Sequence, residues 1–294
     1  MKRLMCVPNV SEGRNRDTIA RLTAVLTEDP HITLIDASSD PDHHRSVFAY
    51  LGEAESVLAA TERLAEEVFR LLDMTDHTGS HPRQGALDVV PFVPLGSTTM
   101  EEAVHVAHEF GRFIGARGVP VYYYENAATR PERVSLVDVR KGEYESLAEK
   151  LKDPAWAPDE GPAVFNPAIG SVQVAARLPL VAFNVNLRTD DLAIAERIAR
   201  AVRCRDGGYR YVRAMGVRLT DSGMVQVSMN LTNYLRTPPH RVLGTIRSEA
   251  ARDGVTVAST EFVGPVPAAM LEEAVRHYFQ APDFRSQQIM EIDR

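Results

Sequence analysis

Cysteine is almost absent from this sequence. Only Cys6 and Cys204 occur among its 294 residues, so one chain can build neither a disulfide framework nor a zinc site held by several thiolates. Long apolar runs are absent as well, since charged residues interrupt each of them well short of a membrane span. The first residues, MKRLMCVPNVSEG, lack the apolar stretch of a signal peptide. We therefore expect a soluble cytoplasmic protein with no membrane partner.

Basic tracts and common enzyme motifs are also absent. The formal charge is −7, and no run of lysine and arginine is long enough to follow a nucleic-acid backbone. The sequence contains no G-x-S-x-G motif, no phosphate-binding loop and no G-x-G-x-x-G fingerprint. These absences argue against nucleic-acid partners and give no support to a nucleotide-dependent mechanism.

What the sequence does contain is an alternation of short β-like runs and longer amphipathic helices. In the second half, the runs PLVAFNVNL, YVRAMGVRL, MVQVSMNL and VTVASTEFV combine with two helical patterns in the order β-α-β-β-α-β. This order is typical of a ferredoxin-like subdomain, and the first half repeats it with an extra helix and strand. We therefore predict an α/β (α+β) protein with two ferredoxin-like subdomains, at 1–178 and 179–294.

One long segment separates these patterns. Residues 153–171, DPAWAPDEGPAVFNPAIGS, are rich in proline and glycine and show no periodicity. Such a stretch inside a compact protein is more often functional than a passive linker. We interpret it as the joint between the halves. Each half should form a sheet with helices on its outer face, so the two bare faces should meet or line a ligand tunnel.

The nine histidines raise the question of a metal site. His105 and His108 have a plausible ligand spacing, but on a helical wheel they fall opposite the apolar side, which favours a solvated face. His43 and His44 lie with two aspartates in SSDPDHHRS, where a β-turn between two strands fits as well as a cation site. Neither pair makes a convincing ligand set, so no metal is expected.

His81 differs from the other histidines in its local chain context. Pro82 restricts the backbone of His81 to extended conformations, so the direction of the imidazole is partly set by the chain itself. Arg83 and Asp88 provide charges able to move its pKa across neutrality. A loop that leads into a sheet is a common place for catalytic groups. His81 is therefore a candidate catalytic residue, and an exposed loop histidine is the alternative.

Polar residues also interrupt two strands that are otherwise apolar. Asp36 follows the run ITLI, and a buried carboxylate there needs a partner, for which Arg45 across the turn is the candidate. Asn184 and Asn186 project from one face of the strand AFNVNL, so they need partners in the facing sheet or on a ligand. Arg177 lies just upstream of that strand. The alternative to a functional Asp36 is a purely structural ion pair.

Several stretches together resemble the formiminotransferase family, also called the glutamate formimidoyltransferases. The similarity runs from Cys6 to about Pro267, and its motifs are CVPNVSEGRN, GSHPRQGALDVVPFVPL, GEYESL, DPAWAPDEGP and VAFNVNL. The block HPR-x-GALDV-x-PF is the most specific of them. After LEEAVRHYFQ the sequence departs from the family, because the remaining APDFRSQQIMEIDR is shorter than in the animal enzymes and leaves no room for their cyclodeaminase domain.

The resemblance implies a fold, an activity and a set of site residues. It implies two α/β subdomains with facing sheets around a folate tunnel, and transfer of a formimino group between N-formimidoylglutamate and N5 of tetrahydrofolate. His81 matches the family's catalytic histidine, and Asp36 matches its active-site aspartate. The family's folate-binding loop corresponds to ten consecutive residues: Gly161, Pro162, Ala163, Val164, Phe165, Asn166, Pro167, Ala168, Ile169 and Gly170.

The chemistry of the substrates agrees with these residue types. A formimino group is a cationic amidine, which a carboxylate such as Asp36 can hold, and the substrate carboxylates suit arginines. Four further residues are candidates for substrate binding on the strength of the strand patterns alone: Arg45, Arg177, Asn184 and Asn186. Tetrahydrofolate is expected as a co-substrate with no metal. The partners expected are folate, formimidoylglutamate or glutamate, and a second copy in a homodimer.

Two alternatives to a glutamate formimidoyltransferase stay open from the sequence. A related transferase could use formimidoylglycine, or a formyl donor in place of a formimino donor. A protein of another class could retain the pocket and bind folate without turnover. The presence of both His81 and Asp36 favours an enzyme over a binding protein.

Overall fold

The computed structural model describes residues 2–79, 82–219, 223–263 and 266–290. His81, the candidate catalytic residue, lies outside the described residues. The chain divides into two compact units, Met1–Arg177 and Leu178–Arg294, and each is described by itself below. Among the helices of the described residues, none is both long enough and apolar enough to span a membrane.

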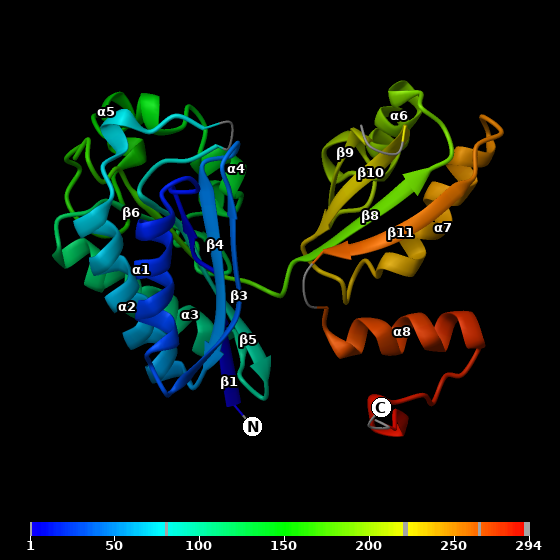
Figure 1. Ribbon diagram of the computed structural model, residues 1–294, viewed down its shortest axis with the longest axis horizontal. Helices are drawn as coiled ribbons and strands as arrows, with labels where there is room; N and C mark the ends of the chain where they lie inside the picture. The colour runs from blue at the N-terminus through cyan, green and yellow to red at the C-terminus, as the bar shows by residue number, and fades with distance from the viewer. Residues whose placement is uncertain (1, 80–81, 220–222, 264–265, 291–294) are drawn as a thin grey trace. The chain divides into compact units, whose positions relative to one another are not determined.

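Unit 1 contains a seven-stranded sheet (Figure 1). Its strands are β1 (Lys2–Cys6), β2 (Asn9–Val10), β3 (Ile32–Asp40), β4 (Arg45–Gly52), β5 (Leu87–Gly96), β6 (Val121–Glu125) and β7 (Val172–Ala176). Its α-helices are α1 (Arg16–Thr27), α2 (Ala54–Leu71), α3 (Met100–Ala116), α4 (Leu136–Val139) and α5 (Leu147–Lys150), and the 3₁₀ turns are η1 (Met74–Asp76), η2 (Pro131–Arg133), η3 (Tyr144–Ser146) and η4 (Pro154–Trp156).

The strand order of unit 1 extends a ferredoxin-like core. Strands β1 and β2 both pair with β4 and β5, so they act as one interrupted strand between these two, and β3 pairs with the other side of β4. These pairs are all antiparallel. Strands β7 and β6 then extend the sheet beyond β5 in parallel pairs. The predicted order with an extra helix and strand is therefore present, with one strand more than predicted.

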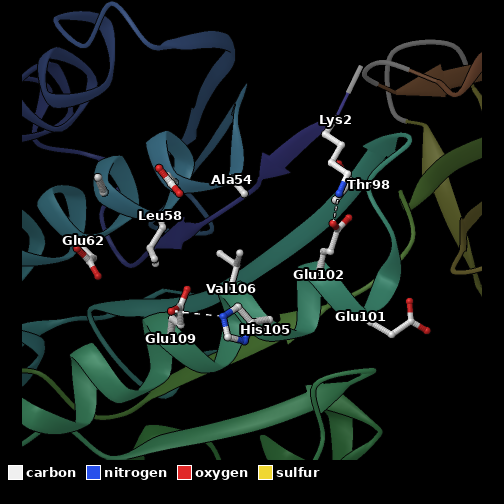
Figure 2. A pocket seen from close by; sticks show the side chains of 12 residues that line it. Lys2, Ala54, Leu58, Glu62, Thr98, Glu101, Glu102, His105, Val106 and Glu109 are labelled. Atoms are coloured by element: carbon white, nitrogen blue, oxygen red, sulfur yellow. Dashed lines mark hydrogen bonds and ion pairs between the residues drawn. The ribbon is translucent and has the colours of Figure 1, made fainter.

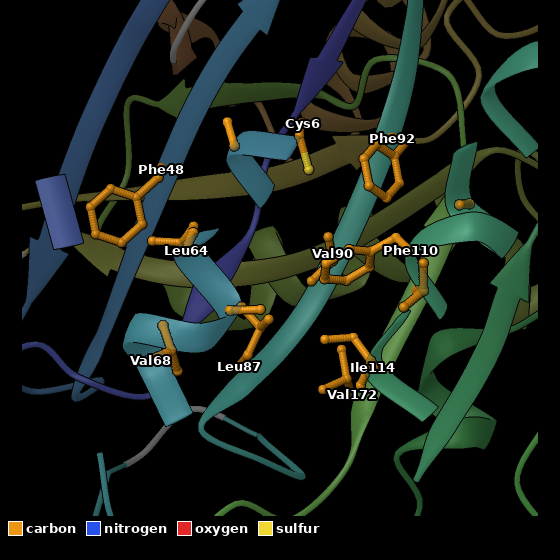
Figure 3. Close-up of a cluster of buried hydrophobic side chains, with 14 of the residues drawn as sticks. Cys6, Phe48, Leu64, Val68, Leu87, Val90, Phe92, Phe110, Ile114 and Val172 are labelled. Carbon is orange, nitrogen blue, oxygen red and sulfur yellow. The ribbon is translucent and has the colours of Figure 1, made fainter. Parts of the chain in front are cut away.

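Helices α1, α2 and α3 lie side by side on one face of this sheet (Figure 1). Each helix buries one apolar side, and alternate strand residues such as Phe48 and Phe92 meet Leu64, Val68 and Phe110 in the main core (Figure 3). The side chain of Asn15 caps α1, and a capping box of Thr99 and Glu102 begins α3.

The strand β7 corrects the interpretation of residues 153–171. Its residues, VQVAA, are all buried, and the strand inserts between β5 and β6 in the sheet of unit 1. The proline-rich segment therefore belongs to unit 1 rather than joining the two halves. A second, smaller apolar cluster packs on the sheet face opposite α1–α3, and its members are Val89, Tyr122, Tyr124, Val139, Leu147, Leu151 and Ala175.

Unit 2 has the predicted ferredoxin-like topology. Its elements are β8 (Val181–Leu187), α6 (Leu192–Val202), η5 (Cys204–Asp206), β9 (Val212–Leu219), β10 (Met224–Leu231), α7 (Pro239–Ala251), β11 (Val257–Val263), α8 (Ala268–Phe279) and η6 (Ser286–Gln288). The four strands are antiparallel in the order β11-β8-β10-β9, which places the first and third strands in the centre. The sequence patterns do not predict α8. Facing sheets and a tunnel between them stay a prediction.

Candidate active site

The segment that follows His81 is anchored in the interior of unit 1. Asp88, near the start of β5, is buried and accepts a hydrogen bond from the backbone N–H of Gln84 at 2.9 Å. Arg140, just after α4, forms an ion pair with the same carboxylate. The backbone carbonyl of Gly85 accepts a hydrogen bond from the Ser11 hydroxyl at 2.7 Å. Residues 82–88 are thus held by one internal hydrogen bond and by contacts from two other parts of the chain.

Arg83 is buried, and polar contacts fix both its guanidinium and its backbone carbonyl. Its Nη2 lies 2.7 Å from Oε1 of Glu145, and its Nε donates to Nδ1 of His77 at 3.2 Å. The backbone N–H of Tyr144 donates to the carbonyl of Arg83 at 2.9 Å. Arg83 and Asp88 were expected as charges close to His81, but each already has an opposite charge as its partner.

Two histidines that the sequence interpretation did not select lie together beside this segment. The rings of His44 and His77 are stacked, with centroids 4.2 Å apart and planes 8° from parallel. Nε2 of His77 contacts the carbonyl of His44 at 3.0 Å, and Nδ1 of His44 contacts the carbonyl of Thr78 at 2.9 Å. Nε2 of His44 lies 3.3 Å from Oε1 of Glu12. These contacts tie the β3–β4 turn to the residues that precede His81.

The side chain of Asp40 closes the same turn through hydrogen bonds. Its Oδ1 accepts hydrogen bonds from the backbone N–H groups of Asp42 and His43, both at 2.8 Å, and its Oδ2 contacts Nδ1 of His43 at 2.9 Å. Within the described residues, no group of three or more histidine, cysteine or acidic side chains is arranged to hold a metal. The β-turn interpretation of SSDPDHHRS therefore holds for the described part of the chain.

Burial shifts the ionisation of several groups in this region. Burial lowers the pKa of His77, and the charges of His44 and Arg83 act in the same direction, whereas the hydrogen bond to the His44 carbonyl acts to raise it. Burial also raises the pKa of Asp88, although Arg140 and the N–H of Gln84 act to lower it. Burial of the Arg45 guanidinium lowers its pKa to about 10. The negative charge of the nearby Asp88 acts in the opposite direction and partly offsets this fall.

Glu12 differs from these groups. Burial acts to raise its pKa, but hydrogen bonds from the backbone N–H groups of Asn15 and Arg14 prevail and lower it. Glu12 is therefore an anion at neutral pH, positioned beside the ring of His44.

Asp36 lies on β3, at the edge of the sheet, and its side chain is exposed. The prediction of a buried carboxylate was wrong, because an edge strand with no element beyond it does not enclose its side chains. Nor does an ion pair join Asp36 to Arg45, both of which the structure describes; Arg45 lies opposite Asp40 in the register. Asp36 instead pairs with Ala49, so it projects from the face opposite to Phe48 and the helices.

The predicted folate loop, 161–170, is exposed at its start and ordered at its end. Gly161, Pro162, Ala163 and Val164 are exposed, whereas Gly170 is buried. Asn166 organises the second half, because its side chain accepts from the N–H of Ala168 at 3.0 Å and its carbonyl accepts from Gly170 at 2.8 Å. These N–H groups are used inside the loop, so they are not available to donate to a ligand.

The two apolar residues of the loop have different surroundings. Ile169 packs against the main core of unit 1. Phe165 packs against the smaller cluster and lies next to Tyr144, with ring centroids 5.6 Å apart. Pro167 accepts a hydrogen bond from the Tyr144 hydroxyl. Phe165, which is only half-buried, is therefore the better candidate for contact with an aromatic ligand.

Two glycines bring this loop against the segment that follows His81. Gly85 and Gly170 form a β-bridge, and a Cβ built on Gly85 would lie 2.3 Å from the carbonyl oxygen of Ser171. Gly170 has φ of +74°, which glycine adopts without strain. The loop and residues 82–88 can lie this close only because neither position carries a side chain.

The remaining candidate residues lie further along the chain. Arg177 follows β7, is partly buried, and donates its backbone N–H to the carbonyl of Phe92 at 3.0 Å. Asn186 contacts Ser259 at 3.0 Å and Gln226 at 2.9 Å. Asn184 accepts from the N–H of Met229 at 3.3 Å. The amides of β8 thus find partners on neighbouring strands of their own sheet.

The helical pair His105 and His108 is divided by the fold. His105 is exposed and lies 3.4 Å from Glu109, as expected for a solvated face. His108 is partly buried, with Nε2 at 2.9 Å from the carbonyl of Ala127 and its ring against Tyr123. The prediction of a solvated face was therefore wrong for His108, because the loop after β6 covers that part of α3.

A groove of about 710 Å³ between α2 and α3 has the wrong charge for the anionic substrates that the sequence resemblance implies (Figure 2). Its floor includes Leu58 and Val106, and its rim carries Glu55, Glu62, Glu101, Glu102 and Glu109 together with Lys2 and His105. Folate and glutamate are anions, so a surface with this excess of carboxylates repels them. The polar side chains of Ser11, His44, Arg45, His77, Arg83 and Asp88 line a second cavity of only about 10 Å³, which has room for about one water molecule.

Comparison with known families covers both units. The formiminotransferase domain, N-terminal subdomain, matches residues 3–177, and the formiminotransferase domain matches residues 182–291. Among solved structures, a microcompartment protein from Desulfitobacterium hafniense aligns with a TM-score of 0.24 and 9% identity over 93% of this chain and 99% of its own, which is too low to inform the fold.

Three curated relatives show how far this similarity extends. The chain is 44% identical to a glutamate formimidoyltransferase of Streptococcus pyogenes, over 95% of this chain and 94% of that protein. It is 40% identical to a glutamate formimidoyltransferase of Thermoplasma acidophilum, over 99% and 97%. It is 39% identical to a formimidoyltransferase-cyclodeaminase of Dictyostelium discoideum, over 94% of this chain but only 53% of that protein.

Proposed function

Because the chain belongs to the formiminotransferase family of tetrahydrofolate-dependent one-carbon transferases, we propose that it is a glutamate formimidoyltransferase. It would transfer the formimino group between N-formimidoyl-L-glutamate and N5 of tetrahydrofolate, a step that links histidine degradation to one-carbon metabolism. The observation that carries this proposal is the close similarity to two glutamate formimidoyltransferases across both units. The contact between the loop 161–170 and residues 82–88 adds structural support.

The reaction requires one proton to move between two nitrogens. N5 of tetrahydrofolate attacks the formimino carbon, and a new C–N bond gives a tetrahedral adduct that carries N5, an amino group and the nitrogen of glutamate. N5 then loses a proton and the glutamate nitrogen gains one. The bond between carbon and that nitrogen breaks, which releases glutamate and 5-formimidoyltetrahydrofolate.

We assign this proton transfer to His81. An imidazole titrates near neutrality, so it can accept the proton of N5 and return it to the departing nitrogen. Its chain neighbours support the assignment, because residues 77–79 and 82–88 are tied to His44 and Glu145, and His44 in turn contacts Glu12. A group that must act within one catalytic geometry needs such support.

The other candidate residues act on the charges of the substrates. Asp36 is an exposed carboxylate on the sheet face opposite α1–α3, where it would hold the amidinium of the formimino group. Arg45 and Arg177 would bind carboxylates of glutamate or of the folate tail. The half-buried Phe165 would pack against an aromatic ring of folate.

Tetrahydrofolate is a co-substrate in this proposal, and the chemistry requires no metal. Two alternatives stay open for the substrates. The donor could be formimidoylglycine in place of formimidoylglutamate, and the transferred group could be formyl in place of formimino. Incubation of the purified protein with tetrahydrofolate and N-formimidoylglutamate, with product identification by mass spectrometry, tests the proposal directly. Formation of glutamate and 5-formimidoyltetrahydrofolate is expected. Binding of folinic acid without any turnover would instead identify a folate-binding protein.

A further inference from the structure

The contacts of His77 determine which of its nitrogens carries a proton. The Nε of Arg83 can only donate, so Nδ1 of His77, 3.2 Å away, has to accept and is unprotonated. Nε2 of His77 faces the carbonyl oxygen of His44 at 3.0 Å, and this oxygen can only accept. Nε2 therefore carries the proton. His77 is a neutral imidazole in a single tautomer, with a guanidinium on one side and a carbonyl on the other.

His77 also links two separate anchors of this loop. Through Arg83 it reaches Glu145, and Glu143 lies 3.5 Å from the same guanidinium. Through the stacked ring and the carbonyl of His44 it reaches the β3–β4 turn. The chain on both sides of residues 80 and 81 is therefore held to one central side chain.

We propose that His77 is a positioning residue, which in its neutral Nε2–H tautomer holds the segment that carries the acid/base of the transferase. The expected effect of His77 on catalysis rests on the proposed function. The charged and titratable groups that face His77 are His44 from the β3–β4 turn, Arg83 from its own loop and Glu12 from the loop after β2. A proton added at Nδ1 would face the N–H of Arg83 and break this contact.

The kinetic test compares two substitutions at the same position. His77→Phe keeps a planar ring for stacking but removes both polar contacts, so kcat should fall about 10²-fold, the cost of a misplaced catalytic group, while KM for tetrahydrofolate changes little. His77→Asn keeps an acceptor near Nδ1 and does not titrate in this range, so it should recover part of kcat and retain it at more acidic pH. His108→Phe is the matched control, because His108 is another histidine of unit 1 that contacts a backbone carbonyl through Nε2 and lies against an aromatic ring.

A spectroscopic test does not depend on turnover. Two-dimensional ¹⁵N–¹H spectra of the imidazoles, with the His77 signal assigned by its loss in His77→Asn, should show the Nε2–H tautomer at neutral pH. Arg83→Met should convert that signal to a mixture of tautomers. A charged ring or the Nδ1–H tautomer in the wild-type protein overturns the inference. If the tautomer is as expected but no transferase activity is found with any donor, the proposed function fails and the structural inference stands.

An equal loss of kcat in His77→Phe and His108→Phe would also count against a positioning role, because it would reflect a general loss of structure. So would a failure of His77→Asn to recover any activity while its tertiary structure, monitored by Trp156 fluorescence, is unchanged. Each of these results separates a role in catalysis from a role in folding.

Discussion

His44 and His77 are 33 residues apart in the chain, yet their rings stack with planes 8° from parallel. The contact joins a turn between two strands to the residues that precede the HPR block. The molecule therefore builds its candidate active site by connecting loops to one another, and the sheet supplies the positions from which those loops start. The predictions below address the separate parts of this arrangement.

Replacement of His81 is the most direct test of the mechanism. His81→Ala should fold and bind folinic acid as the wild type does, because a loop imidazole contributes little to a core. Turnover should fall by about 10²–10⁴, the usual range for loss of a proton-transfer group. Stopped-flow or steady-state assays with formimidoylglutamate measure this. Near-normal turnover in a folded His81→Ala protein would return His81 to the status of a loop residue.

Asp36→Asn provides the contrast with His81→Ala. The amide keeps the size of the side chain but loses the charge that would hold an amidinium, so KM for formimidoylglutamate should rise. Because Asp36 is exposed on an edge strand, thermal stability should be unchanged. A fall in stability without a change in KM would favour a structural role.

Phe165 is expected to contribute to both folate binding and stability. Phe165→Ala should weaken folinic acid binding in calorimetry, and it should reduce the negative heat-capacity change that accompanies apolar burial. It should also lower the free energy of unfolding by about 0.5–3 kcal/mol, because the ring packs on Tyr144 and the smaller cluster. Val164→Ala, at an exposed position of the same loop, is the control. Unchanged affinity in Phe165→Ala would place the folate site elsewhere.

Arg45 and Arg177 are tested by a change of geometry at constant charge. Lysine lacks the planar fork that binds a carboxylate through two parallel hydrogen bonds. Arg45→Lys or Arg177→Lys should therefore raise KM for formimidoylglutamate, whereas Arg112→Lys on the exposed side of α3 should not. Kinetics equal to wild type in both variants would show that neither arginine contacts this substrate.

The stability of unit 1 should depend on pH through His77. Burial lowers its folded-state pKa, so the unfolded chain binds more protons than the folded chain as pH falls through about 6.5. The stability that depends on a neutral His77 is thus fully present above that pH and is lost progressively below it, until the lower folded-state pKa is reached. Relative to His77→Asn, the wild type should lose stability between about pH 7 and about pH 5. Urea unfolding followed by the single tryptophan, Trp156 in unit 1, measures the difference.

A pair of glycine substitutions tests the approach of the folate loop to residues 82–88. Gly85→Ala places a methyl group against backbone oxygens of Ile169 and Ser171, which cannot move aside like flexible side chains. It should destabilise unit 1 by about 1–3 kcal/mol and weaken folate binding. Gly244→Ala, in α7 with open space at its Cβ, should stabilise the protein by about 0.5–1 kcal/mol. Thermal unfolding followed by circular dichroism compares them, and equal effects would contradict the steric argument.

Much of the fold could be predicted because its signals are local. The apolar stripe of α2, the capping box at Thr99 and the alternation in β8 are each readable within one short stretch. The strand β7 was missed since VQVAA is short and contains a glutamine, and its burial on both sides comes from β5 and β6. The sequence patterns did not predict helix α8 either, because this helix has a single buried residue, Met270.

The candidate site shows the same limit more strongly. The HPR block and the loop 161–170 could be located from motifs, but the partners of Arg83 could not, because Glu145 lies 62 residues away. The exposure of Asp36 depends on its strand lying at the edge of the sheet, which is a property of the topology and not of ITLID. Contacts between loops arise only after distant strands have paired.

The position of β7 also governs the order in which unit 1 can be completed during synthesis. This strand is the last of its sheet to be made, yet it fills the gap between β5 and β6. A nascent chain that ends before Val172 therefore exposes two strand edges to the solvent and to other chains. A gene split within 153–171 would create such a species permanently. An insertion after Arg177, where the first unit ends, would leave the sheet of unit 1 uninterrupted.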